Sequence, residues 1–171
     1  AHQKRMNLNK FNNLVDLYFY QAKTQNIKSN FLEWLNPKNK IKFSWEETSS
    51  NIYKVAKVIK ENILDGDRCL LISENRPEWL ISDIAIMLAN GITVPAYTTY
   101  TEKDYKYLIE DCKPSVIIIS NEIINNKIKN IINESLFVKK IITFEELEKQ
   151  HDKKKYITFS SISKKKIQEN D

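Results

Sequence analysis

Glycine is almost absent from this chain, and its scarcity excludes two kinds of nucleotide site. The sequence of 171 residues contains only two glycines, Gly66 and Gly91. A phosphate loop of the Walker type needs two glycines within one short loop, and the dinucleotide-binding fingerprint needs three. Neither motif can be formed here. Glycine-cradled nucleotide binding within these residues is therefore excluded.

Cysteine and histidine are equally scarce, which excludes several reactive sites. Cys69 and Cys112 lie far apart in the sequence, so the chain has neither a CxxC redox motif nor paired zinc ligands. Both lie in or beside apolar stretches, and we expect buried hydrophobic residues rather than reactive thiols. His2 and His151 have no partner arrangement for nucleophilic catalysis. We predict no catalytic residue and no metal site in this chain.

Arginine is the third rare residue. Only three of the 27 basic residues are arginines, namely Arg5, Arg68 and Arg76, although the formal net charge is +5. Proteins that read nucleic-acid sequence depend on arginine for bidentate contacts to bases, so we expect no nucleic-acid partner. The lysine runs at 153–155 and 164–166 favour a solvated tail. Contact with an anionic membrane surface is the second interpretation.

Long apolar runs are also missing. No segment approaches the roughly 18 consecutive apolar residues of a membrane-spanning helix. Hydrophobic residues make up 42% of the chain and charged residues 29%, which is an ordinary balance for a globular domain with its own core. We expect a cytoplasmic protein. Peripheral contact with a membrane is the second alternative.

The first part of the chain predicts a helix followed by a β-hairpin. Apolar residues recur three and four positions apart within residues 8–25, as on one face of a helix. Two short candidate strands follow at 31–35 and 41–43, and the Asn-Pro turn signal between them indicates a hairpin.

A second helix is predicted after the hairpin. Ser44 can accept a hydrogen bond from the free amides of the first turn, and Glu47 three residues later can complete a capping box. Apolar residues continue at helical spacing to Ile63. Gly66 is the natural left-handed residue at which this helix ends.

From residue 68 onward, short apolar runs alternate with helical patterns. The predicted strands are 69–72, 92–94, 116–119 and 141–143. The predicted helices are 77–89, which begins at a proline and stops before Gly91, 102–112, which begins after a Thr101–Asp104 capping arrangement, 122–133, and 144–150. This alternation predicts an α/β fold: an open parallel sheet of βα units in three layers, preceded by the N-terminal helix and the hairpin. The continuous run 116–119 indicates a central strand covered on both faces.

The chain divides into three parts. Residues 1–10 are a leader or residues added in cloning, residues 11–150 form the α/β part, and residues 151–171 form a lysine-rich polar tail or linker.

Four short segments carry a resemblance to a known family. They are residues 43–47, 65–68, 72–79 and 91–97, and the pattern continues through 101–113 and 116–120. In this order and spacing they resemble the N-terminal part of long-chain fatty acyl-CoA synthetases, which are AMP-binding, adenylate-forming enzymes. The resemblance covers roughly residues 11 to 150.

The resemblance implies an ATP-dependent ligase that adenylates a fatty acid substrate and then transfers the acyl group to CoA. ATP, Mg²⁺ and CoA are implied for the full-length enzyme. The family's glycine-rich phosphate loop has no counterpart here, because the nearest hydroxyl cluster, residues 98–101, lacks glycine. We therefore expect an incomplete part of a larger domain, catalytically inactive alone and with no cofactor bound to it.

Two segments are candidates for the site. Tyr97, Thr98 and Thr99 follow the carboxyl end of a predicted strand, where open α/β sheets place ligands, and they are candidates to line an acyl or CoA path. Thr98 departs from the proline that the family commonly has there. The second segment, which matches the family over Glu74, Asn75, Arg76, Pro77, Glu78 and Trp79, we expect to be mainly structural.

Two other functional classes stay open. The alternative is a stand-alone α/β module that binds protein or lipid without catalysis. A small enzyme of flavodoxin or receiver type is less favoured, because Glu74 is the only acidic residue close after the first strand of the sheet. If the sheet continues in missing chain, the isolated piece exposes an unpaired strand edge and an apolar surface, and we expect it to self-associate.

Overall fold

The computed structural model describes residues 12–35, 40–148, 151–152 and 155–166. The elements in chain order are α1 (Leu14–Thr24), β1 (Asn30–Leu35), β2 (Lys40–Ser44), α2 (Trp45–Lys60), β3 (Arg68–Ile72), α3 (Pro77–Leu88), β4 (Ile92–Ala96), α4 (Glu102–Cys112), β5 (Val116–Ile119), α5 (Glu122–Glu134), β6 (Lys140–Thr143), β7 (Tyr156–Thr158) and α6 (Phe159–Ser163).

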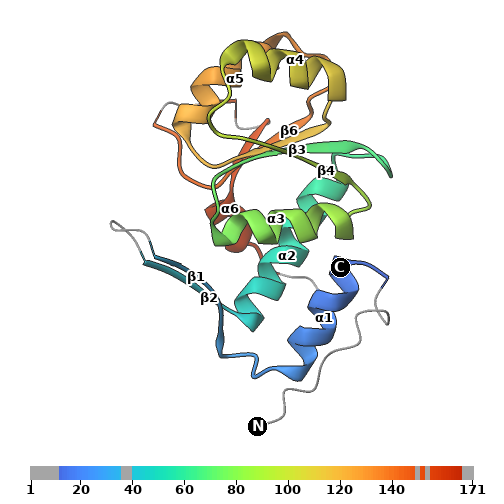
Figure 1. The fold of residues 1–171 in the computed structure, drawn as a ribbon, viewed down its shortest axis with the longest axis vertical. Coiled ribbons are helices and arrows are strands. Elements are labelled where there is room, and N and C mark those ends of the chain that lie inside the picture. Colours follow the sequence, from blue (N-terminus) through green and yellow to red (C-terminus); the bar gives the residue numbers. More distant parts are fainter. Residues whose placement is uncertain (1–11, 36–39, 149–150, 153–154, 167–171) are drawn as a thin grey trace.

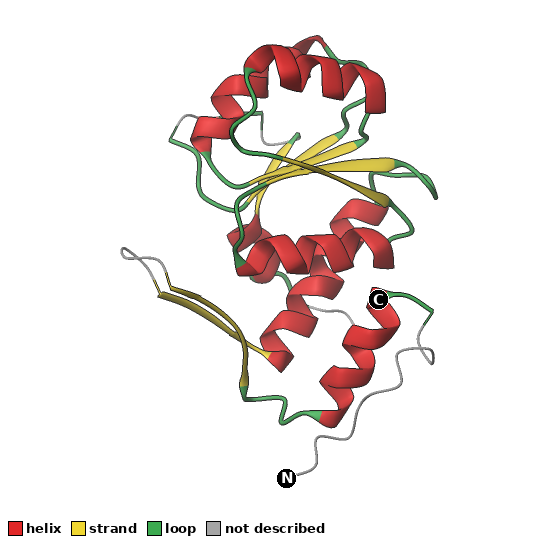
Figure 2. Ribbon diagram, viewed as in Figure 1, coloured by secondary structure: helices red, strands yellow, loops and turns green. Residues whose placement is uncertain are grey.

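The helices and the main sheet form three layers (Figures 1 and 2). The sheet lies in the middle, with α4 and α5 on one face and α2, α3 and α6 on the other. The helix α1 and the antiparallel hairpin of β1 and β2 pack against the layer that contains α2 and α3. The predicted three-layer α/β fold with an N-terminal helix and hairpin is confirmed.

The main sheet has five strands in the order β4-β3-β5-β6-β7, and all neighbouring strands are parallel. The strand β3 therefore pairs with β4 on one side and β5 on the other. At the edge, β4 contains Pro95, which has no N–H to donate and is tolerated where a strand has only one partner.

The two faces of the sheet bury separate hydrophobic clusters. Along β5, Val116 and Ile118 pack into the cluster under α2 and α3, whereas Ile117 and Ile119 pack into the cluster under α4 and α5. All four are fully buried, because successive side chains of a strand point to opposite faces. The predicted central strand is confirmed.

Local capping signals set the starts of two helices. The Ser44 side chain accepts a hydrogen bond from the Glu47 amide at 3.1 Å at the start of α2. Thr101 and Asp104 form a reciprocal capping box at the start of α4. The ends are less well predicted: α2 stops at Lys60, short of Ile63, and α1 begins at Leu14. The expected start of that helix at residue 8 lies outside the described residues.

The left-handed residue after α3 is Asn90, with φ of 62°, and not Gly91. Gly91 instead lies in a tight place, since a Cβ there would lie 3.1 Å from both Ile63 Cδ1 and Ile86 Cγ2. Gly66 does adopt the left-handed conformation expected of it, with φ of 84°. This residue lies in the turn before β3 and not at the end of α2, which stops six residues earlier at Lys60. The Gly66 amide donates to the Asn90 carbonyl.

The predicted helix at 144–150 is wrong over its described residues, 144–148, which are irregular. The first two backbone amides of this segment continue the pairing of the sheet instead. Phe144 N–H donates to the Ile119 carbonyl at 2.9 Å, and Glu145 N–H donates to the Ser120 carbonyl at 3.0 Å. These bonds extend the pairing with β5 and place the buried Phe144 ring in the core.

Residues 151–171 were expected to form a polar tail or linker, and part of this segment instead joins the fold. Tyr156–Thr158 pair in parallel with β6 as β7, and α6 follows. Phe159 and Ile162 of α6 are buried in the cluster under α2 and α3. The overall composition of the segment did not indicate these two buried residues, because lysine runs flank them at 153–155 and 164–166. Among the described residues, no helix has the length and apolar character needed to cross a membrane.

The packing of α6 generates a stability prediction. Replacing Ile162, which is 0% exposed, with alanine should lower the free energy of unfolding by about 2–5 kcal/mol, because it leaves a cavity in the core. The matched control is Ile123→Ala on α5, whose side chain is 70% exposed. Chemical denaturation measures both variants. Equal stability of the two would show that α6 does not pack as described.

Candidate functional site

The topology of the sheet creates a switch point at the carboxyl ends of β3 and β5. These strands are neighbours, but the chain leaves β3 toward α3 on one face and leaves β5 toward α5 on the opposite face. The loops at their ends, residues 73–76 and 120–121, therefore diverge. Open α/β sheets place their ligands at such switch points, so this edge of the sheet is the candidate site.

A buried guanidinium lies at the end of the loop that follows β3. Arg76 occupies the N-cap position of α3, and its side chain is only 3% exposed. Its Nε donates to Glu78 Oε2 at 2.5 Å, and its Nη1 contacts Glu145 Oε1 at 2.9 Å and Glu74 Oε1 at 3.2 Å. One cation therefore joins the loop after β3, the first turn of α3 and the loop after β6.

Aromatic rings enclose the same guanidinium. Arg76 Cζ lies 4.4 Å from the ring centroid of Trp34 in β1 and 5.5 Å from that of Phe144. A guanidinium is attracted to the face of an aromatic ring at this distance. The contact with Trp34 fastens the hairpin to the start of α3, although the two segments are far apart in the sequence.

The charges of this network are strongly perturbed. Burial raises the pKa of Glu78, and the nearby Arg76 only partly offsets this effect. Burial also opposes the charge on Arg76, but Glu78, Glu145 and Glu74 outweigh it and raise the pKa of the guanidinium. Arg76 therefore stays charged. The second carboxylate oxygen of Glu78, Oε1, is buried and has no hydrogen-bond partner among the described residues.

The family-like segment around Arg76 was expected to be mainly structural. Pro77 occupies the first turn of α3, as expected, but the Arg76 side chain makes no capping hydrogen bond. It turns to the carboxylates instead. Trp79 is partly buried against the cluster under α2 and α3. These contacts are structural, and ligand contact by Glu74 or Asn75 stays untested.

The residues proposed to line a path, Tyr97, Thr98 and Thr99, follow the end of β4 at the same edge of the sheet. Their loop is held through its backbone. Lys127 Nζ of α5 donates to the Thr98 carbonyl at 3.2 Å and to the Tyr100 carbonyl at 2.9 Å. The Tyr105 hydroxyl donates to the Tyr97 carbonyl. The loop is thus fixed while the Tyr97 side chain stays 72% exposed.

Sequence reasoning missed several of these contacts. Trp34, Phe144, Glu145 and Lys127 lie far in sequence from the groups they touch. An aromatic residue in a hairpin or a lysine on a helix is too common to indicate such a partner. The only available signal was the presence of Arg76 in an otherwise arginine-poor chain.

Other reactive chemistry finds no support in the described part of the chain. Cys69 and Cys112 are buried, as predicted, and burial raises the pKa of Cys69 to about 12, which keeps it a thiol at neutral pH. In residues 12–35, 40–148, 151–152 and 155–166, no cluster of three or more His, Cys, Asp and Glu side chains is arranged to hold a metal ion.

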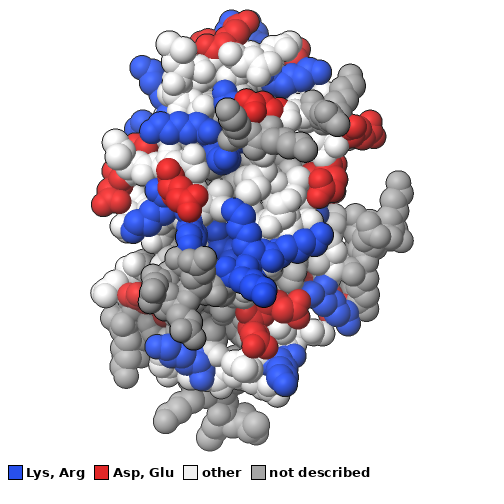
Figure 3. Space-filling model, turned by 180° about the vertical axis from the view of Figure 1, so that it is seen from behind, with Lys and Arg blue, Asp and Glu red and all other residues white. Residues whose placement is uncertain are grey.

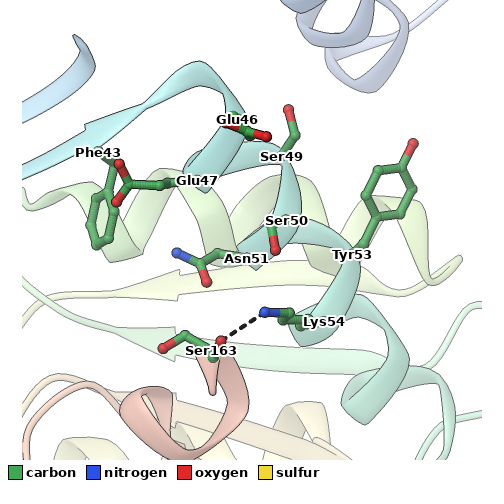
Figure 4. Close-up of a pocket in the computed structure, with 9 residues that line it drawn as sticks. All are labelled: Phe43, Glu46, Glu47, Ser49, Ser50, Asn51, Tyr53, Lys54 and Ser163. Carbon is green, nitrogen blue, oxygen red and sulfur yellow. Dashed lines mark hydrogen bonds between the residues drawn. The ribbon is translucent and has the colours of Figure 1, made fainter. Parts of the chain in front are cut away.

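A hollow of about 690 Å³ lies away from the switch point, along α2 and beside the end of α6 (Figure 4). Its lining includes the rings of Phe43 and Tyr53 and the ammonium of Lys54. Because it opens on the side of α2, it is not connected with the strand ends. We therefore choose the candidate site by the topology of the sheet and not by the size of this hollow.

Comparison with known proteins finds related sequences over most of the chain. The family model described as "AMP-binding enzyme" matches residues 19–171. The chain is 32% identical over 93 residues to the mitochondrial acyl-coenzyme A synthetase ACSM5 of Homo sapiens, covering 53% of this chain and 16% of that protein. It is 28% identical over 113 residues to the long-chain-fatty-acid–CoA ligase ACSBG1 of Rattus norvegicus, covering 63% of this chain and 16% of that protein.

Solved structures share the fold. The acetoacetyl-CoA synthetase from Streptomyces lividans superposes with a TM-score of 0.77 at 11% identity, over 90% of this chain and 25% of that one. At this identity the likeness concerns the fold alone. The matched region spans about one sixth of the two relatives above.

The Arg76 network generates the second prediction. Arg76→Met should lower the free energy of unfolding by about 3–5 kcal/mol, because it leaves the Glu78 carboxylate buried without its cation. Adding Glu78→Gln should recover part of the loss. Arg68→Met, at an exposed arginine of β3, is the control and should change stability by less than about 0.5 kcal/mol. Urea denaturation compares them, and similar values for both arginine variants would contradict the network.

Proposed function

Because the chain belongs to the AMP-binding enzyme family, we propose that it is the amino-terminal part of a long-chain fatty acid–CoA ligase. In the proposed reaction, a fatty acid carboxylate attacks the α-phosphorus of ATP and displaces pyrophosphate. The thiol of CoA then attacks the acyl carbon, loses its proton and releases AMP. The observation that carries this proposal is the family match over residues 19–171 together with the parallel-sheet fold.

The long-chain substrate is supported by one relative in particular. The rat protein that covers 63% of this chain is named as a long-chain-fatty-acid–CoA ligase, whereas the name of the human relative gives no chain length. The names of the relatives do not point to the cytoplasm, since the human relative is named as mitochondrial. The cytoplasmic location stays a prediction from the sequence.

The described residues do not fit the triphosphate of ATP. The loop after β4 carries hydroxyls but no glycine, and its backbone carbonyls at Thr98 and Tyr100 face Lys127. Carbonyl oxygens cannot neutralise phosphate charge, which requires amides, cations or a metal. We infer that this chain supplies the scaffold of the ligase, and that ATP and Mg²⁺ are held by other parts of the full-length enzyme, which also uses CoA.

We further propose that Tyr97, Thr98 and Thr99 line the path of the acyl chain or of CoA. Three observations support this role: the position beyond the end of β4, the backbone held by Lys127 and Tyr105, and the exposed Tyr97 ring. The self-association expected of an isolated piece also stays a prediction. The strands that would present open edges are β4 and β7.

The third prediction tests incompleteness. This chain alone should catalyse no fatty-acid-dependent exchange of pyrophosphate into ATP, because the groups that hold the triphosphate are absent. The same assay on the protein encoded by the continued reading frame should show exchange. Robust exchange by the 171 residues alone would contradict incompleteness, and a stop codon after Asp171 would favour the stand-alone binding module.

The fourth prediction tests the path. In the complete enzyme, Tyr97→Ala should raise the KM for the fatty acid or for CoA by about tenfold, the factor that corresponds to about 1.4 kcal/mol of lost contact. Tyr107→Ala on α4 is a matched control, because its side chain is 74% exposed compared with 72% for Tyr97. Unchanged KM values for both substrates in the Tyr97 variant would remove it from the path.

A further inference from the structure

Lysine side chains gather where the last helix ends. Lys164, Lys165 and Lys166 directly follow α6, and all three are exposed. Lys54 of α2 reaches the same point, because its Nζ donates to the Ser163 carbonyl at 2.7 Å (Figure 4). Figure 3 shows Lys and Arg side chains collected in the middle of one face of the molecule. We call Lys54 and Lys164–Lys166 the lysine surface.

Carboxylates do not neutralise the lysine surface. Within the described residues, none of its four ammonium groups lies within ion-pair distance of an Asp or Glu side chain. Two acidic residues at the start of α2, Glu46 and Glu47, line the adjoining hollow as well. The surface therefore presents net positive charge to solvent.

Two aromatic rings line the hollow to which Lys54 and Ser163 also contribute. The hollow beside the lysine surface is lined by Phe43 and Tyr53, and the Tyr53 side chain is about half exposed. A tyrosine ring with a polar tip, placed beside lysines, suits the boundary between water and the headgroups of a bilayer.

We propose that the lysine surface binds the anionic headgroups of a lipid bilayer. Lysine ammonium groups are compact point charges that are attracted to an anionic membrane surface without needing a fixed geometry. No arginine contributes to the surface, which disfavours the bidentate contacts of nucleic-acid recognition. The proposal goes beyond ligase activity and holds whether or not the chain is part of a ligase.

Vesicle sedimentation tests this proposal with the 171-residue chain. The chain should co-sediment with phosphatidylcholine vesicles that contain phosphatidylserine and not with vesicles of phosphatidylcholine alone. The variant K164Q/K165Q/K166Q should bind at least about tenfold more weakly, because each lysine near an anionic surface adds to the attraction. Salt near 1 M should abolish binding, since it shortens the Debye length to about 3 Å.

The matched control removes the same charge elsewhere. The variant K103Q/K106Q/K139Q changes three exposed lysines, two on α4 and one directly before β6, and it should bind like the parent chain. Equal loss in both variants would overturn the proposal, because binding would then follow net charge alone. Absence of binding, equal binding to neutral vesicles, or tighter binding to an oligonucleotide would each overturn it as well. Circular dichroism checks that both variants are folded.

Discussion

The rest of the structure depends on one buried cation. Arg76 has lost almost all contact with water, and a charge in that position is tolerated only because carboxylates and aromatic rings surround it. Its partners come from the hairpin, from the first turn of α3 and from the loop after β6. Moving any of these segments would leave a buried charge without compensation. The network therefore fixes the hairpin and two strand-end loops relative to each other.

This constraint also supports the edge of the sheet that carries the candidate site. The topology makes loops diverge after β3 and β5, and diverging loops lose mutual support. Arg76 restores that support on the side of α3. On the other side, Lys127 and Tyr105 hold the loop that follows β4 through its carbonyls. Both anchors use a side chain from a neighbouring element, so the exposed side chains of the loops stay available.

The sequence predicts what local chemistry decides. The helix at 102–112 has the predicted bounds because Thr101 and Asp104 satisfy each other's amides, and the strand at 116–119 could only be buried. The segment at 144–148 defeats local reasoning, since its amides bond to Ile119 and Ser120 of a distant strand. The location of Tyr97 beyond a strand end follows from βα topology. Its anchor Lys127 does not, because helical periodicity says nothing about which loop a lysine reaches.

Both glycines of the chain lie away from the edge of the sheet that carries the candidate site. Gly66 is occupied by a left-handed turn before β3, and Gly91 is held where a Cβ would press on Ile63 and Ile86. Both lie at the amino ends of strands, which is the edge opposite to the candidate site. A glycine-rich phosphate cradle must lie at the carboxyl ends, where loop amides and helix starts converge. The fold therefore uses neither of its glycines at the edge where such a cradle would lie, which supports the proposal that the phosphate-binding amides come from other parts of the ligase.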